Sequence, residues 1–204
     1  MLSSSPKRSR LTPRAKSAEI TRDDLIEEKA SWSLPTVGEV KRKLNLAHGE
    51  DDKQIDRIIT AVMDYFQKAT DHMLRKQERE AEYDAVAGWY RLPKGPFVSF
   101  DSVVSVREGE ETEQDLDNYY TKGGEPRIIK AKDVALSDGN RTRITYTVGY
   151  EEKTDVPHGI REGLSKMAVD LYEHRTSAPI TGQTLSEAPF NFDRLVAPYT
   201  MYSA

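Results

Sequence analysis

Carboxylates form the densest group of chemically capable side chains in the sequence. They lie between residues 108 and 117, as Glu108, Glu110, Glu111, Glu113, Asp115 and Asp117. Paired acids can bind a divalent cation or share a proton. No histidine lies within the run to complete such a site, and runs of like charge are normally solvated. We therefore interpret the run as an exposed acidic loop.

The other residue patterns that carry chemistry are missing. The histidines are His48, His72, His158 and His174, and no two of them have the four-residue spacing of ligands on one helix face. The chain has no cysteine, no phosphate-binding loop, no nucleophile elbow and no HExxH motif. The pair Gly123-Gly124 is typical of a hairpin turn. The sequence predicts no catalytic residue, no cofactor and no metal site, so the chain is not expected to be an enzyme.

Charge is distributed unevenly along the chain, which has 204 residues and a formal net charge of -4. Every charged side chain in residues 1–18 is basic: Lys7, Arg8, Arg10, Arg14 and Lys16. Such a basic arm binds nucleic acid or an acidic partner, or is simply a solvated terminus. The chain contains no apolar run long enough to cross a bilayer and no signal-peptide pattern, so we expect no membrane contact and synthesis in the cytoplasm.

Helical patterns occur in both halves of the sequence. Thr36 and Glu39 form a capping-box pair for a short helix that should end near 45–49. A second and longest helix should begin at Asp51 or Asp52 and continue toward Arg79, because apolar residues recur at helical spacing from Ile55 to Leu74. A third should begin after Pro157, with an apolar stripe from Ile160 to Tyr172. One or two helical turns are also expected after Thr21.

Strand patterns occupy the middle of the chain. They cover residues 102–107, 115–120 and 127–130, and the clearest is 141–150, where Ile144, Tyr146 and Val148 share one face. Asp138-Gly-Asn is a turn signal before this last strand. The sequence thus predicts an α+β fold: a small antiparallel helical bundle with a long second helix, a short antiparallel sheet or hairpin insertion, and a C-terminal tail.

The two ends of the chain differ from its middle. We expect a basic N-terminal extension over 1–31, a central domain over 32–187 and a C-terminal docking segment over 188–204. The last segment is apolar and would invite a partner if it were exposed, through Phe190, Phe192, Leu195, Val196 and Tyr199. The alternative is that this segment packs back on the chain's own core.

Several segments, taken in order, resemble the head–tail connector (adaptor) proteins of tailed bacteriophages and gene transfer agents. Residues 34–46, LPTVGEVKRKLNL, are similar to the family's opening helix, and the Asp51-Asp52 start resembles its second helix. Residues 92–103, LPKGPFVSFDSV, are similar to its proline-led strand. DNYY at 117–120, GEPRI at 124–128, TYTVGY at 145–150 and LVAPY at 195–199 resemble its later motifs. The resemblance spans Leu34 to Tyr199; residues 1–31 and the charged stretch 75–84 fall outside it.

This resemblance implies a structural protein of the virion neck. Family members form a ring, usually of twelve copies, below the portal protein, where they extend the channel for double-stranded DNA. They also carry the head-closure (stopper) or tail-terminator protein. On this basis Glu108, Glu110, Glu111 and Glu113 would face the channel and repel phosphates. The alternatives are another neck component, namely a head-closure or tail-terminator protein, and a DNA-binding packaging accessory protein that uses the basic arm.

Overall fold

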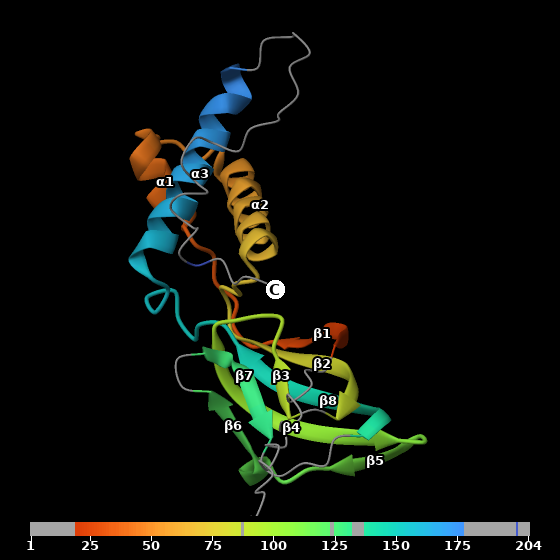
Figure 1. Cartoon of the computed structure of the whole chain (residues 1–204). Coiled ribbons are helices and arrows are strands. Elements are labelled where there is room, and N and C mark those ends of the chain that lie inside the picture. Colours follow the sequence, from red (N-terminus) through yellow and green to blue (C-terminus); the bar gives the residue numbers. More distant parts are fainter. Residues whose placement is uncertain (1–18, 87, 123–124, 132–136, 178–198, 200–204) are drawn as a thin grey trace, which may run out of the picture.

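The helices and the strands occupy opposite ends of the molecule. The computed structural model describes residues 19–86, 88–122, 125–131, 137–177 and 199. Three helices, α1 (Val37–Leu44), α2 (Asp52–Thr70) and α3 (His158–Ser177), pack together at one end, and the strands form the other (Figure 1). The predicted mixture of helices and antiparallel strands is confirmed, and the two kinds of element are segregated.

Local signals set the bounds of α1. The Thr36 hydroxyl accepts a hydrogen bond from the Glu39 backbone N–H at 3.3 Å, and a Glu39 carboxylate oxygen accepts one from the Thr36 N–H at 2.7 Å. This reciprocal pair is the predicted capping box. Asn45 ends the helix in the left-handed region at φ 56°. Asparagine tolerates that conformation better than most residues, and the predicted end of this helix is confirmed.

The capping box makes part of the stability pH-dependent. The backbone hydrogen bond from Thr36 lowers the pKa of Glu39 in the folded chain. A lowered folded-state pKa stabilises the fold above the unfolded pKa, and that contribution disappears as the pH falls through the folded value. We expect Glu39→Ala to cost about 0.5–1 kcal/mol at pH 7, with solvent screening limiting the effect, and to cost less at acid pH.

Chemical denaturation of the unchanged protein and of Glu39→Ala at several pH values measures how the difference in their free energies of unfolding depends on pH. Glu110→Ala, which removes an exposed carboxylate of a surface hairpin, is the control and should show no such pH-dependent gap. A loss from Glu39→Ala that stays constant down to acid pH would contradict the role of the ionised carboxylate.

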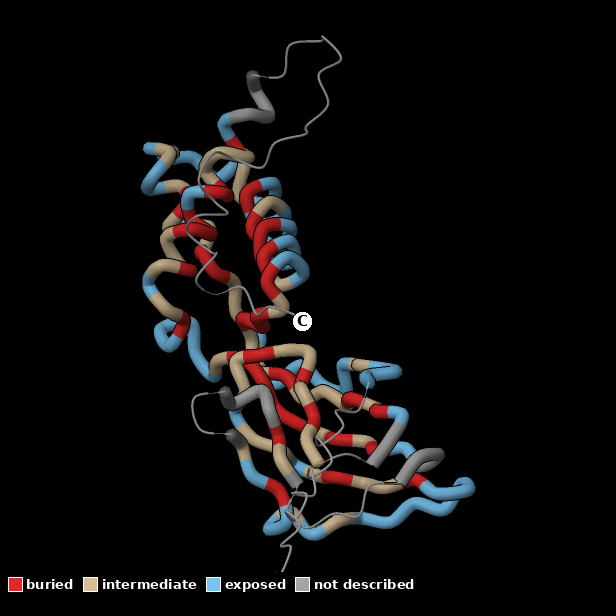
Figure 2. Tube along the Cα trace, in the orientation of Figure 1, coloured by how far each residue is buried: buried red, intermediate tan, exposed pale blue. Residues whose placement is uncertain are grey.

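The helical core is built from the predicted apolar faces of α2 and α3. Figure 2 shows the buried positions along the facing sides of these helices. The core comprises Val40 of α1, Ile55, Ile59, Val62, Met63 and Phe66 of α2, and Ile160, Leu164, Met167, Ala168 and Tyr172 of α3. The helix face predicted from sequence spacing is therefore confirmed for both longer helices.

Helix α2 ends earlier than expected. Its last residue is Thr70, and Asp71 follows in the left-handed region at φ 56°. Met73 and Leu74 are buried beyond the helix, and residues 77–86 form strand β2 (Gln77–Val86). In β2 the odd positions Ala81 and Tyr83 are buried, while Glu78, Glu80 and Glu82 lie on the other face. The expected extension of α2 toward Arg79 is therefore wrong.

Two antiparallel sheets pack face to face at the other end. The larger has the order β1 (Ile20–Glu28), β2, β8 (Ser137–Val148), β4 (Phe97–Arg107), β5 (Glu110–Glu113). The smaller has the order β3 (Trp89–Arg91), β7 (Glu125–Ala131), β6 (Tyr119–Lys122), and a 3-10 turn, η1 (Leu116–Asn118), precedes β6. Their shared core contains Tyr83, Tyr90, Leu92, Val103, Ile129, Ile144 and Tyr146.

These sheets correct the expected proportions of the fold. The protein is not a helical bundle with a small β insertion, because eight of the described elements are strands in two sheets with their own core. The helical turns expected after Thr21 are wrong, since Ile20–Glu28 forms the edge strand β1. The turn expected at 138–140 is also wrong, because these residues lie within β8. The alternation of Ile144, Tyr146 and Val148 toward the core is confirmed.

A narrow junction joins the helical core to the sheets. The Gly149 N–H donates to Pro96 O at 2.9 Å, and the Lys76 N–H donates to Tyr150 O at 2.9 Å. Gly149 has φ +93°, and a Cβ at this position would lie 2.1 Å from the carbonyl oxygen of Arg75. The two chain segments therefore approach so closely that only glycine fits.

Candidate functional site

Four of the predicted acidic residues, Glu108, Glu110, Glu111 and Glu113, lie in the β4–β5 hairpin. The other two lie outside it: Asp115 caps the 3-10 turn η1, and Asp117 lies within that turn. Glu108 at φ 53° and Gly109 at φ 91° form the turn, and Glu110–Glu113 forms strand β5, so the expected loop is in fact largely a strand. All four glutamates are exposed. Glu111 accepts a hydrogen bond from Arg143 at 3.0 Å, and the other three project their charge into solvent around the sheet's outer strand. The hairpin is thus an exposed acidic projection, suited to repel a polyanion.

The opposite edge of the same sheet is strand β1, which no sequence pattern indicated. A mostly buried ion pair fixes it to β2: Asp23 accepts two hydrogen bonds from Arg79, at 2.6 and 3.1 Å. Tyr146 also donates to Asp23, at 3.0 Å. Burial alone would lower the pKa of Arg79, but the hydrogen bond and charge of Asp23 outweigh it and raise that pKa. The described part of the expected N-terminal extension is therefore held by a specific polar cluster.

Strand β1 also exposes apolar side chains. Leu25 is 52% exposed and Ile26 is 51% exposed. An edge strand with such residues offers unpaired backbone groups and apolar surface to a neighbouring chain. The basic arm residues Lys7, Arg8, Arg10, Arg14 and Lys16 lie outside the described residues, and their role stays a prediction.

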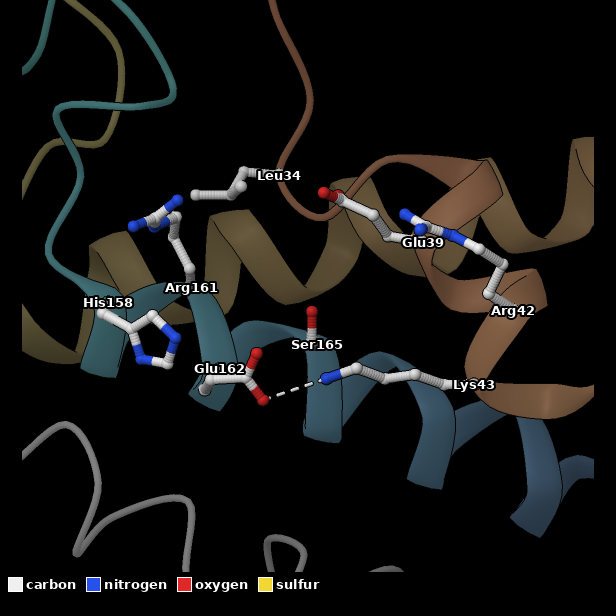
Figure 3. A pocket seen from close by; sticks show the side chains of 8 residues that line it. All are labelled: Leu34, Glu39, Arg42, Lys43, His158, Arg161, Glu162 and Ser165. Carbon is white, nitrogen blue, oxygen red and sulfur yellow. Dashed lines mark hydrogen bonds and ion pairs between the residues drawn. The ribbon is translucent and has the colours of Figure 1, made fainter.

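A hollow of about 370 Å³ lies between α1 and α3 (Figure 3). It is lined by Leu34, Glu39, Arg42, Lys43, His158, Arg161, Glu162 and Ser165. Lys43 donates to Glu162 at 3.0 Å, and this hydrogen bond lowers the pKa of the Glu162 carboxyl. The ion pair joins α1 to α3, and Glu39 is already held by the capping box of α1. Arg42 donates to the Gly38 carbonyl oxygen of its own helix, so Lys43–Glu162 is the ion pair of this hollow that connects α1 to α3.

The hollow brings together a histidine, a carboxylate and a hydroxyl without making a catalytic arrangement. Figure 3 shows His158, Glu162 and Ser165 on successive turns of α3. Ser165 is seven residues after His158, which places it roughly 10 Å further along the helix axis. That is far beyond the hydrogen-bond reach a nucleophile and its base require.

Across the described residues, no three metal-ligating side chains lie close enough together to hold an ion. None of the described helices has the length and apolarity needed to cross a membrane.

Of the predicted C-terminal docking residues, Tyr199 is the one that the structure describes. Phe190, Phe192, Leu195 and Val196 lie outside the described residues. Tyr199 packs against the helical core, with its ring centroid 6.2 Å from that of His72. The idea that this segment packs back on its own chain is thus supported at Tyr199, and its docking role stays a prediction.

Comparisons with known proteins add information on the fold. No protein-family model matches the chain, and no curated protein matches it. Its fold is similar to that of a chain in the neck of an empty gene transfer agent (GTA) particle computed with C6 symmetry. This chain is 18% identical, with a TM-score of 0.69 over 90% of the present chain and 97% of the other.

Two further structures agree with the first. A chain from the virion of a native GTA particle is 17% identical, with a TM-score of 0.68, and covers 90% of the present chain and 97% of its own length. A chain from the neck of a native GTA particle computed with C12 symmetry is 15% identical, with a TM-score of 0.57, over 88% and 97%. The chain therefore has the fold of a protein found in gene transfer agent necks.

Proposed function

We propose that this protein is a structural component of a virion neck, and specifically the head–tail connector (adaptor). The observation that carries the proposal is the whole-chain fold similarity to neck chains of gene transfer agent particles, which extends over 97% of those chains. The ordered series of sequence motifs from Leu34 to Tyr199 supports the same assignment independently. The protein works by binding and geometry and has no catalytic role.

In this proposal the subunits form a ring, usually of twelve copies, beneath the portal protein. Neighbouring copies would cover the exposed apolar edge of β1, since a ring gives each copy a partner on both sides. The acidic hairpin with Glu108, Glu110, Glu111 and Glu113 would face the channel and keep its wall from gripping the phosphates of the passing DNA. The head-closure (stopper) or tail-terminator protein would bind the opposite face of the ring.

The C-terminal docking segment is proposed to bind the portal or a neighbouring subunit. We expect the double variant Phe190→Ser/Phe192→Ser to lose attachment to portal-bearing, DNA-filled heads by at least tenfold, because truncated aromatic anchors commonly cost about 2 kcal/mol or more. Co-sedimentation of labelled protein with heads measures attachment. This variant leaves Tyr199 in place and so disturbs the packed core less than deletion of 188–204.

The exposed Tyr120→Ser variant serves as the control for loss of a surface aromatic, and its attachment should equal that of the unchanged protein. Normal attachment of the Phe190/Phe192 variant would refute the docking role. The remaining alternatives are another neck component and a DNA-binding accessory protein. Attachment to purified DNA in the absence of heads, weakened steeply by salt, would favour the accessory protein.

A further inference from the structure

Four aromatic rings meet at the junction between the helices and the sheets. His72 lies at their centre and is only 4% exposed. Phe66 contacts it edge-on with ring centroids 5.8 Å apart, and Tyr150 stacks on it at 5.7 Å, with 3.0 Å between His72 Nε2 and the Tyr150 hydroxyl. Tyr199 supplies the fourth ring, edge-on to His72 at an interplanar angle of 84°. Three rings belong to the body of the protein and the fourth to its C-terminal segment.

The place occupied by Tyr199 depends on a glycine. Gly159 lies in the first turn of α3, and a Cβ there would lie 2.7 Å from the Tyr199 hydroxyl oxygen and 3.4 Å from its Cε2. Real Cβ atoms do not approach other atoms as closely as 2.7 Å, so a residue with a Cβ at 159 would force the Tyr199 hydroxyl to shift. Glycine lowers helix stability by up to about 1 kcal/mol relative to alanine. Here it provides the space for Tyr199.

We propose that His72, Tyr150 and Gly159 form a seat for the chain's own C-terminal segment, anchored by Tyr199, which the segment leaves when it binds its neck partner. The inference rests on the proposed function. Tyr199 is one of the apolar residues of the docking segment, and a ring packed against His72 and Gly159 is not available to a second protein. The seat and the partner therefore compete for the Tyr199 side chain. A subunit whose Tyr199 is in the seat cannot dock through it, so the seat lowers the fraction of subunits that can bind the partner.

The seat also has a defined electrostatic character. Burial raises the pKa of the Tyr150 phenol to about 12, and the nearby Tyr199 phenol contributes in the same direction. Tyr150 is therefore a neutral hydroxyl at physiological pH, and Tyr199 lies beside this phenol and the His72 ring. Aromatic pairs of this kind hold a ring with modest strength, which permits exchange for a better partner.

The test blocks the seat without touching the tail. Gly159→Ala places a methyl group 2.7 Å from the Tyr199 hydroxyl oxygen. Gly38→Ala is the matched control, because Gly38 also lies in the first turn of a helix, α1, and a Cβ there would meet nothing within 4 Å. A fluorotyrosine introduced only at position 199 reports the environment of that ring by ¹⁹F NMR in the free protein, and attachment to DNA-filled heads is measured on the same variants.

We expect the fluorine resonance of Gly159→Ala to move toward the value of a solvent-exposed tyrosine, and that of Gly38→Ala to stay in place. Attachment to heads should strengthen roughly three- to tenfold for Gly159→Ala, the range that loss of one aromatic contact would release. A resonance unaffected by Gly159→Ala overturns the seat. A resonance that depends on protein concentration overturns it as well, because a second copy would then fill the site.

The two proposals fail in different ways. If the unchanged protein does not attach to heads, the adaptor function fails, and the resonance in the free protein still decides whether the seat exists. If Gly159→Ala exposes Tyr199 but attachment does not strengthen, the release step is wrong while the adaptor function stands.

Discussion

Replacing Gly149 by alanine is expected to destabilise the protein by about 2–6 kcal/mol. The residue has φ +93°, a conformation that side chains with a Cβ rarely adopt, and that strain costs roughly 1–3 kcal/mol. The new Cβ would also lie 2.1 Å from Arg75 O and 2.6 Å from Arg75 C, against backbone that pairs across the junction. Overpacking of that kind adds roughly 1–3 kcal/mol.

Gly109→Ala is the matched control for this prediction. Gly109 has nearly the same dihedral, φ +91°, but a Cβ there would meet nothing within 4 Å. Gly109→Ala should therefore lower the free energy of unfolding only by the backbone strain, roughly 1–3 kcal/mol. Denaturant unfolding of both variants separates the strain from the clash. Equal losses in the two variants would show that the junction tolerates a side chain at 149, contrary to the packing described.

Removing the Asp23 carboxylate is expected to cost about 3–5 kcal/mol. Asp23→Ala leaves the Arg79 guanidinium without its carboxylate partner, with only the Gln77 side chain and the Asp23 carbonyl oxygen to accept from it. The Asp23 and Arg79 side chains are 14% and 12% exposed, respectively. The Tyr146 hydroxyl loses its acceptor as well. Because this cluster holds the edge strand, we expect hydrogen exchange in residues 20–28 to accelerate more than exchange elsewhere in the sheet.

Two comparisons make the Asp23 result specific. Asp24→Ala removes the next carboxylate along the strand, whose ion pair with Arg22 is largely exposed, and should cost less than about 0.5 kcal/mol. The double variant Asp23→Leu/Arg79→Met should recover much of the loss, because replacing a buried pair together avoids a lone buried charge. Protection of β1 that survives Asp23→Ala unchanged would contradict the clamp.

The sequence predicted those parts of the fold that local residues determine. The capping box of Thr36 and Glu39 depends on residues three positions apart, so its pattern can be read directly. The apolar faces of α2 and α3 were predicted for the same reason, since helical spacing is visible within each segment. Strand β8 alternates apolar and polar residues, and its core face was also predicted.

Long-range pairing decides the parts that were missed. The sequence of strand β1 is charged and has only a weak helical pattern. It pairs as a strand with β2, where Asp23 accepts a hydrogen bond from Arg79, 56 positions away. Strand β2 carries so many charges that its two-residue alternation was hidden, and the spacing of apolar residues before it suggested a longer α2. The fold therefore contains more sheet than the sequence alone indicated.

In the candidate site, too, the local residue patterns could be predicted from the sequence and the long-range contacts could not. The acidic run was visible as composition, but its position on a hairpin tip follows from the pairing of β4 with β5. Nothing in the sequence around Gly159 or Tyr199 indicates that these residues meet, because they are far apart along the chain. The exposed edge of β1 could not be foreseen either, since the strand itself was not.

Cryo-electron microscopy of DNA-filled, portal-bearing heads mixed with the purified protein tests the central claim most directly. The adaptor assignment predicts a ring of copies immediately below the portal, continuing its channel, with the hairpin of Glu108, Glu110, Glu111 and Glu113 toward the DNA. A ring located further down the neck would instead identify a closure or terminator component. Heads with no added density at the portal vertex, in the presence of folded protein, would contradict the assignment to the neck.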